Sequence, residues 1–518
     1  MTLRRMTVLF GALLAGAGDA AAGDKTDVVR DLAGRVGPII GSALACRDIA
    51  RPRIQIIVDK FTAVITEAST NEADRSDLTQ ILDRNVANGR GAVTSGRMDC
   101  RSADRQLADL EQSIAGPGPS LSAVIAPTSA AAATAPTAPV SVGPPVRGVT
   151  DREIRFGIAA PFSGASKELG RQMKLGIETA FNRVNDAGGV EGRMLKLIAA
   201  DDAFTPARTA EAMKQLYEKD QVFGVIGNVG TSTAAVAVPY ALERRMLFFG
   251  GFTGANVIRN DPPDRYVFNY RASYTEETDA AVRYFIKMRR ILPRQIAVFA
   301  PQQDPGGDAG YAGVAKAFRT LGFSDAGILR LEYKRNTVDV DDAVNLLKAQ
   351  KVPIKAVVMI ASYRAAARFI EKTRDLYPDM LTSNVSFVGS TALADELKLL
   401  GPRYATGAIV TQVVPAVSGY SSIVLEYKNA LTKYFPGEAP DYVSLEGYVS
   451  ANVLIQALKR TGPQLDTEKL IDVLENMRNL DLGLGAQLSF GRAEHQASHK
   501  IWGTALDETG KYQAIELE

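Results

Sequence analysis

Residues 154–202 contain the pattern that most narrows the choice of fold: a strand, a polar turn, an amphipathic helix, a glycine-rich turn and a second strand. Ile154, Phe156 and Ile158 alternate with other residues, as expected of a short strand. After a break at 161–164, apolar residues recur three and four positions apart, which predicts a helix packed along one face. These residues are Leu169, Met173, Ile177, Ala180, Phe181 and Val184. The strand–helix–strand order predicts a parallel α/β sheet, and such sheets bind ligands beyond the carboxyl ends of their strands.

The alternation of strand and helix continues along the chain. Short apolar segments, typical of buried parallel strands, are expected at 195–199, 222–226, 246–249, 295–299, 328–331, 356–360, 386–388 and 407–411. Thr205 precedes Pro206, a residue type favoured at the first helical position. Glu276 and Glu277 suit the N-terminus of another helix. The predicted fold class is α/β, with two Rossmann-like lobes in residues 151–518.

The N-terminal part of the chain differs in composition. Arg4 and Arg5 precede a short apolar run and the small residues at 20–22, the pattern of a secretory signal peptide over residues 1–22. An uncleaved anchor is the alternative, although the run is shorter than the roughly 20 residues that span a bilayer. Residues 24–114 have helical spacing of apolar residues and predict a small helical N-terminal domain. Residues 115–150 are rich in Pro, Ala, Thr and Ser and predict a linker.

Cys46 and Cys100 are the only two cysteines of the chain. The signal peptide predicts a periplasmic location, where an oxidising environment lets cysteines pair. An even number of cysteines in an exported chain also favours a disulfide. We therefore predict a bond between Cys46 and Cys100, with two free thiols as the alternative.

The composition argues against several functions. Lys and Arg total 60 and Asp and Glu total 58, so the net charge is +2, and with no basic block we expect no nucleic-acid partner. The chain lacks a P-loop, a G-x-G-x-x-G and a G-x-S-x-G motif, so we expect no enzyme activity and no cofactor. His495 and His499 are the only histidines and have no acidic third ligand at metal-site spacing. They predict a solvated surface or turn rather than a metal site.

The order of motifs from residue 154 resembles the type I periplasmic solute-binding proteins, in particular the leucine/isoleucine/valine-binding group that feeds ABC transporters. The pattern is a strand, a turn with Ser163-Gly, a helix, N-x-x-G-G-x-x-G and a strand that ends at Asp201-Asp202. The resemblance implies two lobes joined by three crossovers. Lobe one would hold about 151–272 and 410–485, and lobe two about 273–409 and 486–518.

The resemblance also implies a function. A receptor of this family closes its two lobes over a small polar solute and is not an enzyme, and the permease subunits of an ABC importer recognise the closed form. A periplasmic sensor or accessory protein with the same fold is the alternative. The N-terminal domain favours that alternative, because an importer receptor needs only the two lobes.

The residues that match the family's ligand contacts follow predicted strands. Thr231 falls where a hydroxyl and helix-start amides grip a ligand carboxylate, an arrangement that the helix dipole favours, although a simple helix cap is the alternative. Thr253 and Gly254 match the next contact loop. Tyr363 matches an aromatic residue that closes over the ligand, and a surface residue at a helix start is its alternative. The full implied set is Ser163, Thr231, Ser232, Thr253, Gly254, Tyr363 and Thr391.

Three departures from the family's pattern bear on the ligand. Thr391 or Ser390 stands where amino-acid binders have a glutamate that pairs with the ligand's ammonium, and a hydroxyl does not neutralise a buried charge. Gly306 and Leu169 replace aromatic contacts. We therefore expect a neutral or singly anionic solute, such as a small carboxylate or an amide, rather than a branched-chain amino acid. Asp304 or another acid is the alternative partner for an amine.

The disulfide of lobe one in this family is a further departure. Phe204 and Gly230 stand at its two positions. The substitution removes a covalent link and leaves the predicted fold unchanged.

Overall fold

The computed structural model describes residues 22–46, 48–69, 71–96, 98–114 and 145–517. The chain divides into two compact units, Met1–Ala138 and Pro139–Glu518, which are described separately. The expected signal peptide, except for Ala22, and most of the expected linker lie outside the described residues. Within the described residues, no helix is both long and apolar enough to cross a bilayer.

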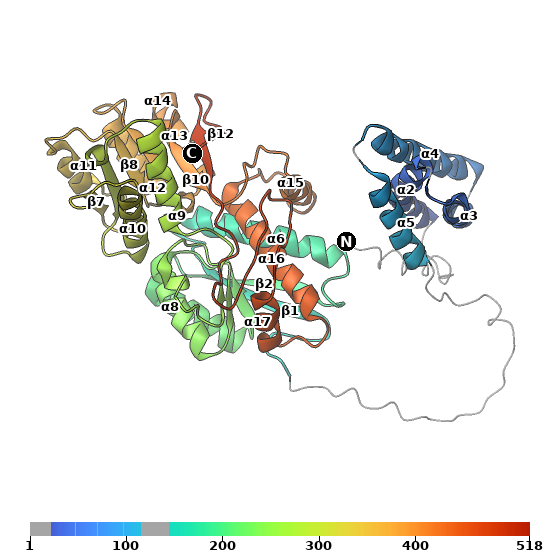
Figure 1. Ribbon diagram of the computed structural model, residues 1–518. Coiled ribbons are helices and arrows are strands. Elements are labelled where there is room, and N and C mark those ends of the chain that lie inside the picture. The colour runs from blue at the N-terminus through green and yellow to red at the C-terminus, as the bar shows by residue number, and fades with distance from the viewer. Residues whose placement is uncertain (1–21, 47, 70, 97, 115–144, 518) are drawn as a thin grey trace. The chain divides into compact units, whose positions relative to one another are not determined.

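The first unit is helical, as predicted, and its helices are drawn in blue in Figure 1. They are α2 (Ala22–Ala45), α3 (Arg51–Ala68), α4 (Glu72–Thr94) and α5 (Cys100–Ile114). Helix α2 packs closely against α4, because a β-carbon at Gly89 would lie only 2.1 Å from the Pro38 carbonyl oxygen. Cys46 and Cys100 form the predicted disulfide, with their Cα atoms 5.6 Å apart. The bond joins the residue after α2 to the first residue of α5, and both cysteines pack in the apolar core of this unit.

The first sheet of the second unit forms lobe one. Its strand order is β2-β1-β3-β4-β5, and all its pairs are parallel. The strands are β1 (Glu153–Ala160), β2 (Met194–Asp201), β3 (Gly224–Ile226), β4 (Leu247–Phe249) and β5 (Val267–Phe268). Apolar side chains of α7 (Pro206–Lys214) and α8 (Thr231–Glu243) join one buried cluster with the sheet, and those of α6 (Lys167–Asp186) join the other. The predicted α/β layering of this lobe is confirmed.

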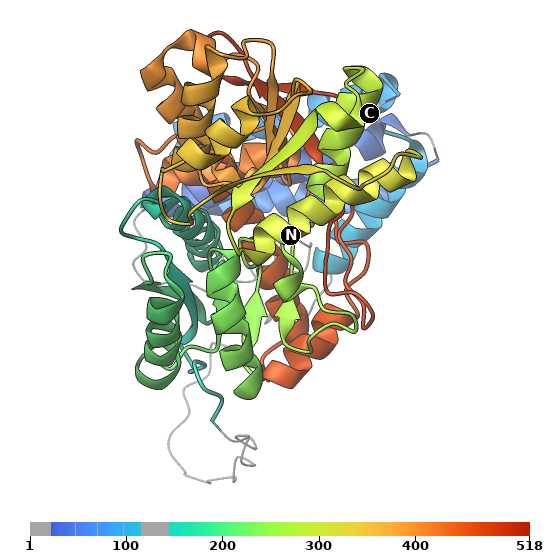
Figure 2. The ribbon, with the colours of Figure 1, turned by 90° about the vertical axis from the view of Figure 1, so that its left-hand side faces the viewer.

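Three later helices complete lobe one. They are α15 (Ser422–Tyr434), α16 (Tyr442–Thr461) and α17 (Thr467–Glu475). Helix α16 lies against α6 so tightly that a β-carbon at Gly176 would lie 1.8 Å from the Ser444 carbonyl oxygen. The chain therefore returns to lobe one after building most of lobe two, as Figure 2 shows by the orange helices beside the green ones.

The second sheet forms lobe two and has the order β12-β11-β10-β9-β8-β6-β7. Its strands are β6 (Ile296–Pro301), β7 (Leu329–Tyr333), β8 (Ala356–Met359), β9 (Leu381–Asn384), β10 (Ile409–Gln412), β11 (Trp502–Leu506) and β12 (Tyr512–Ile515). Pairs from β7 to β10 are parallel, and β11 and β12 add an antiparallel edge. Its helices are α9 (Tyr274–Arg283), α10 (Pro305–Thr320), α11 (Asp341–Lys348), α12 (Tyr363–Arg374), α13 (Ser390–Leu400) and α14 (Pro402–Ala405).

Two expectations about lobe two need correction. The strand expected at 386–388 is a 3-10 turn, and the true strand, β9, is Leu381–Asn384. Its Thr382, Ser383 and Asn384 are buried, so a search for apolar runs passes over it. The lobe boundary expected at 410 cuts β10, which the second sheet holds entirely.

The last crossover also lies later than expected. The backbone of Asn269 bonds to His495, and that of Tyr270 to Ser498, so this stretch still lies on lobe one. His495 is buried and stacks on the Phe268 ring at 3.8 Å between centroids. The prediction of a solvated histidine is therefore wrong for His495, whereas His499 is exposed. The stacking partner is remote in sequence, and local polarity does not reveal it.

Candidate ligand-binding cleft

A small cavity lies between the two lobes of the second unit. Its volume is about 30 Å³, which is room for about two or three water molecules. Lobe one contributes Phe204 and Thr231. Lobe two contributes Tyr274, Pro301, Asp304, Gly306, Tyr333, Arg335, Asn336, Ile360, Ala361, Ser362 and Phe387. The cavity adjoins the carboxyl ends of strands in both sheets, where parallel α/β sheets hold ligands.

Thr231 is the first residue of α8, and its side chain is buried. Its Oγ1 lies 2.7 Å from the Thr253 Oγ1, and the Thr253 hydroxyl also accepts a bond from the Ala255 amide. The residue before α8 is Gly230, with φ of 107°, so no side chain caps the helix. The first amides of α8 and the Thr231 hydroxyl therefore form a wall suited to an anionic group.

Aromatic rings from both lobes meet beside this wall. Phe387 of lobe two stacks on Phe204 of lobe one at 6.1 Å and lies 5.4 Å from the Phe252 ring. Tyr274 meets Phe387 edge-on at 6.2 Å. A β-carbon at Gly230 would lie 2.4 Å from the Phe204 ring, so the two positions that carry a disulfide in the family are neighbours here as well, and the ring occupies the space.

Polar contacts also cross between the lobes. Arg335 Nη1 and Asn336 Nδ2 both donate to the Phe204 carbonyl oxygen, at 3.2 Å and 3.0 Å. The Tyr363 hydroxyl donates to the Ala165 carbonyl oxygen at 2.7 Å. These contacts and the stacked rings exist only when the lobes are together, so the structure describes a closed cleft.

Comparison with known proteins agrees with this architecture. The model of the family described as periplasmic binding protein matches residues 153–511 of this chain. The chain belongs to the periplasmic binding protein family. It is a type I member of the Leu/Ile/Val-binding group.

Individual relatives cover most of this family domain. The Leu/Ile/Val-binding protein BraC3 of Rhizobium johnstonii is 24% identical, over 70% of this chain and 94% of its own. Leu/Ile/Val-binding protein homolog 3 of Brucella melitensis is 24% identical, over 64% of this chain and 86% of its own. A possible leucine/isoleucine/valine-binding protein from Rhodopirellula baltica SH 1 has a solved structure with a TM-score of 0.67. It is 35% identical and covers 72% of this chain and 98% of its own.

The residues expected at the site from family resemblance do not all meet at the cavity. Thr231 lines the cavity, and Thr253 does not line it but forms a hydrogen bond with the Thr231 hydroxyl. The Gly254 carbonyl accepts from the Tyr274 amide at 2.7 Å, and a β-carbon at Gly254 would lie 2.4 Å from the Tyr274 ring. The absence of a side chain at Gly254 therefore allows the Tyr274 ring of lobe two to pack against the backbone of lobe one. The Ser232 hydroxyl is buried and has no hydrogen-bond partner among the described residues.

Three other expected residues lie outside the cavity lining. Ser163 is exposed, and its Oγ donates to the Asp201 carboxylate at 2.6 Å. Thr391 bonds to the buried carboxyl of Asp441. Tyr363 is buried and makes the contact between the lobes described above. All three do follow strands or strand-end turns, but the chain carries their side chains away from the cavity.

Asp304, expected from the sequence as an alternative partner for an amine, lines the cavity. It is the N-cap of α10, its side chain is 7% exposed, and its Oδ1 accepts from the Gly306 and Gly307 amides at 2.8 and 3.3 Å. Burial raises the pKa of Asp304 above the ordinary value, although these amides and Arg335 oppose the shift. The Asp-Pro pair that starts α10 is visible in the sequence and signals a helix cap, but it does not show that the carboxylate faces a cleft.

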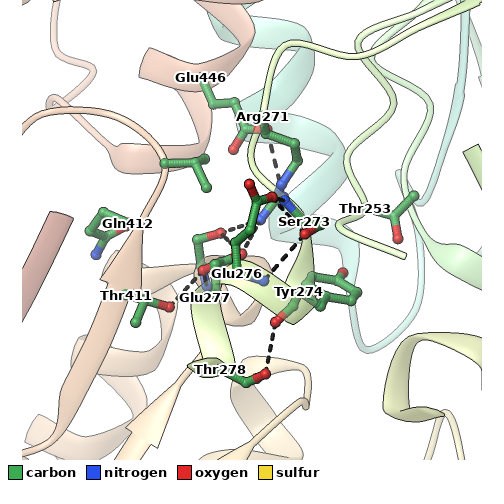
Figure 3. A network of polar contacts seen from close by, with 12 residues as sticks. Thr253, Arg271, Ser273, Tyr274, Glu276, Glu277, Thr278, Thr411, Gln412 and Glu446 are labelled. Carbon is green, nitrogen blue, oxygen red and sulfur yellow. Dashed lines mark hydrogen bonds and ion pairs between the residues drawn. The ribbon is translucent and has the colours of Figure 1, made fainter. Parts of the chain in front are cut away.

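A buried polar network lies beside the cavity, where the chain first crosses between lobes (Figure 3). Arg271 and Glu277 are 1% and 0% exposed and form an ion pair at 2.9 Å. Glu277 also accepts from the Ser386 amide at 2.7 Å and the Thr411 hydroxyl at 2.6 Å. Glu446 of α16 lies 3.6 Å from Arg271. The network joins the first crossover, the turn before α13, strand β10 and a helix of lobe one.

Glu446 makes this network sensitive to pH. Burial raises its pKa from 4.5 to about 7, so between these values the folded chain holds a proton that the unfolded chain releases. The stability from this group is present below about pH 4.5 and is lost as the pH rises through about 7. We expect Glu446→Gln to flatten the fall in melting temperature between about pH 5 and about pH 8, measured by circular dichroism. The exposed Glu243→Gln is the control, and an equal slope in wild type and Glu446→Gln would contradict the assignment.

Proposed function

We propose that this chain is the extracytoplasmic solute-binding receptor of an ABC importer, located in the periplasm. It closes two lobes over a small polar or carboxylate-bearing solute. The observation that carries the proposal is the cavity between the lobes, with the Thr231 hydroxyl and the uncapped start of α8 on its wall. Helix-start amides and a hydroxyl are the groups that bind a carboxylate without a cation.

Closure of the two lobes is the change by which the permease subunits would distinguish a loaded receptor from an empty one. The contacts of Arg335 and Asn336 with Phe204 form only in the closed state. A solute that touches both walls favours that state, so binding shifts the population from open to closed. Permease subunits that recognise the closed form then receive only loaded receptors.

A sensor or accessory role is the second candidate. The observation that favours it is the disulfide-bonded helical unit that precedes the two lobes. A purified permease–ATPase complex separates the two candidates: solute-loaded receptor stimulates ATP hydrolysis if the chain serves import, and leaves it unchanged if the chain serves sensing.

The direct test is a thermal-shift screen of small metabolites against the whole secreted chain. A solute present at about 100 times its dissociation constant stabilises the folded state by about 2.7 kcal/mol. The proposal expects a shift in the transition of the two-lobed unit and none in the helical unit. If no small solute shifts that transition, the receptor function is contradicted.

Thr231→Ala tests the carboxylate wall. The variant removes a hydroxyl that lines the cavity and is expected to weaken binding of a carboxylate solute by about 1–3 kcal/mol, because a buried partner is left unpaired. Isothermal titration with the best solute of the screen measures the change. Thr467→Ala is a matched control, since Thr467 is the first residue of α17 and does not line the cavity. Equal affinities for wild type and Thr231→Ala would reduce Thr231 to a packing role.

A further inference from the structure

Another concave surface lies at the end of lobe two that is remote from the cleft. It is a groove with a volume of about 680 Å³, and the buried residues Phe318 and Ile354 form part of its floor. Strand β6 runs from the groove to the cavity, because Ile296 at its start lines the groove and Pro301 at its end lines the cavity. A strand of this length spans about 20 Å, so the groove is separate from the ligand-binding cleft.

Large apolar side chains are exposed along the groove. Leu292, Phe323 and Val352 line it and are 45%, 41% and 38% exposed. They belong to three separate loops, which precede β6, follow α10 and follow α11. Exposed apolar residues that gather on one face, with polar residues around them, mark a surface that binds a protein or a membrane.

Cations surround these apolar side chains. Residues 287–294 contain four cations and residues 348–355 contain three, and neither segment contains an acid. The fold joins the two segments, since the Lys355 amide donates to the Gln295 carbonyl oxygen at 2.8 Å. All seven cations are exposed, and none of them forms an ion pair with another described residue. The segments are remote in sequence, so this concentration of positive charge arises from the tertiary structure.

The charges decide which partner fits this face. Asp325, the acid of the third loop, already pairs with Arg319 and does not offset the seven cations. A second copy of this chain would bring the same cations against each other, which disfavours self-association through the groove. An anionic bilayer is complementary to the face, because its phosphates attract Lys and Arg and its hydrocarbon accepts protruding apolar side chains. Cations spread over two segments also suit a continuous anionic surface better than a few fixed acids of a protein partner.

We propose that this end of lobe two is a docking surface for membranes that contain anionic phospholipids. Leu292, Phe323 and Val352 enter the headgroup region, and Arg294 and Lys351, which also line the groove, bind lipid phosphates. Docking is peripheral and needs no solute, so the inference goes beyond the proposed function. Because the groove and the cavity lie at opposite ends of β6, a docked chain keeps its cleft free to open and close.

Sedimentation with vesicles tests the proposal on the whole secreted chain. One set of vesicles holds equal parts of phosphatidylglycerol and phosphatidylcholine, and the other holds phosphatidylcholine alone. We expect at least about tenfold tighter binding to the anionic vesicles, because each cation near an anionic surface contributes about fivefold. Raising the ionic strength from about 0.1 M to about 1 M should remove most of this preference, since it shortens the screening length from about 10 Å to about 3 Å.

Two variants test whether the groove is the binding surface. Arg294→Glu/Lys351→Glu reverses two charges and is expected to weaken binding to the anionic vesicles by about tenfold or more. Phe323→Ser removes an exposed ring and is expected to weaken it by about fivefold. The substituted residues are exposed, so the melting curves followed by circular dichroism should match that of wild type.

The matched controls lie on lobe one. Lys196→Glu/Lys219→Glu reverses two exposed cations outside the groove. Leu425→Ser removes an apolar side chain that has the same 41% exposure as Phe323. Both control variants are expected to bind the anionic vesicles as wild type does.

The outcomes are separate from those that test the proposed function. Equal binding to the two kinds of vesicle overturns the docking surface, and absence of binding to both overturns it in favour of an acidic protein segment as the occupant. Wild-type binding by either groove variant, or an equal loss in the lobe-one controls, overturns it as well. The solute-induced thermal shift of the two-lobed unit should be the same in the groove variants and in wild type, so the receptor function is judged by that shift alone.

Discussion

Glu277→Ala is expected to lower the free energy of unfolding of the two-lobed unit by about 3–5 kcal/mol, because it leaves the Arg271 guanidinium buried without its main partner. Arg271 is 1% exposed and reaches Glu277 at 2.9 Å. The same substitution also removes the acceptor of two hydrogen bonds, because the Ser386 amide and the Thr411 hydroxyl both donate to this carboxylate. Chemical denaturation followed by tryptophan fluorescence measures the loss, since Trp502 of β11 is the only tryptophan.

Two further variants show whether burial causes this effect. Glu468→Ala breaks an exposed pair with Arg265 and is expected to cost about 1 kcal/mol or less. Arg271→Met with Glu277→Gln removes both charges of the 2.9 Å pair and is expected to be less destabilising than Glu277→Ala below about pH 7. The third group of the network, Glu446, also loses Arg271, but burial already raises its pKa to about 7, so it is held protonated rather than left as a buried charge. Equal losses in Glu277→Ala and Glu468→Ala would contradict the view that this network holds the first crossover.

Loss of the disulfide is expected to lower the free energy of unfolding of the helical unit by a similarly large amount. Cys46 and Cys100 are 54 residues apart in sequence. In the chain-entropy account, a bond closing a loop of this length stabilises by about 4 kcal/mol. The double variant Cys46→Ala/Cys100→Ala should lower the free energy of unfolding of this unit by that amount.

The whole chain supplies the control for this experiment. Hydrogen exchange reports on each unit separately, so the two-lobed unit should keep its protection while residues of α2 and α5 lose theirs. Treatment of wild type with a reductant should reproduce the effect, and should leave the double variant unchanged. Protection of α2 and α5 that is equal in all samples would show that helix packing alone holds the unit together.

The fold of this chain can be predicted from the sequence more completely than the residues that line the cavity. Regular spacing of apolar residues identifies α6, and β1 is visible because Phe156 and Ile158 alternate in a buried strand. Strand β9 escapes because Thr382 and Ser383 are polar residues buried by their neighbours. Burial of this kind arises from the tertiary structure and leaves no local pattern.

At the candidate site, too, the sequence predicts the position of a residue in the sheet but not its tertiary contacts. The position of a residue after a strand places it at the correct edge of the sheet but does not fix where its side chain points. Thr231 points into the cavity, whereas Ser163 turns to Asp201 and Thr391 to Asp441. Asp304 and Phe204 reach the cavity only because two lobes close on each other, and a contact between distant segments cannot be read from either segment alone.

Closure of the two lobes over a solute can be measured as a change in the distance between them. Lys167 of α6 and Lys398 of α13 are exposed residues on opposite lobes. Both native cysteines are bonded to each other, so spin labels on Lys167→Cys and Lys398→Cys report only on the lobes in pulsed electron paramagnetic resonance. We expect the solute with the largest thermal shift to move the distance distribution to one narrower population at a shorter distance. Thr231→Ala should require a higher solute concentration for the same change. A distribution that stays the same with saturating solute would contradict closure of the lobes.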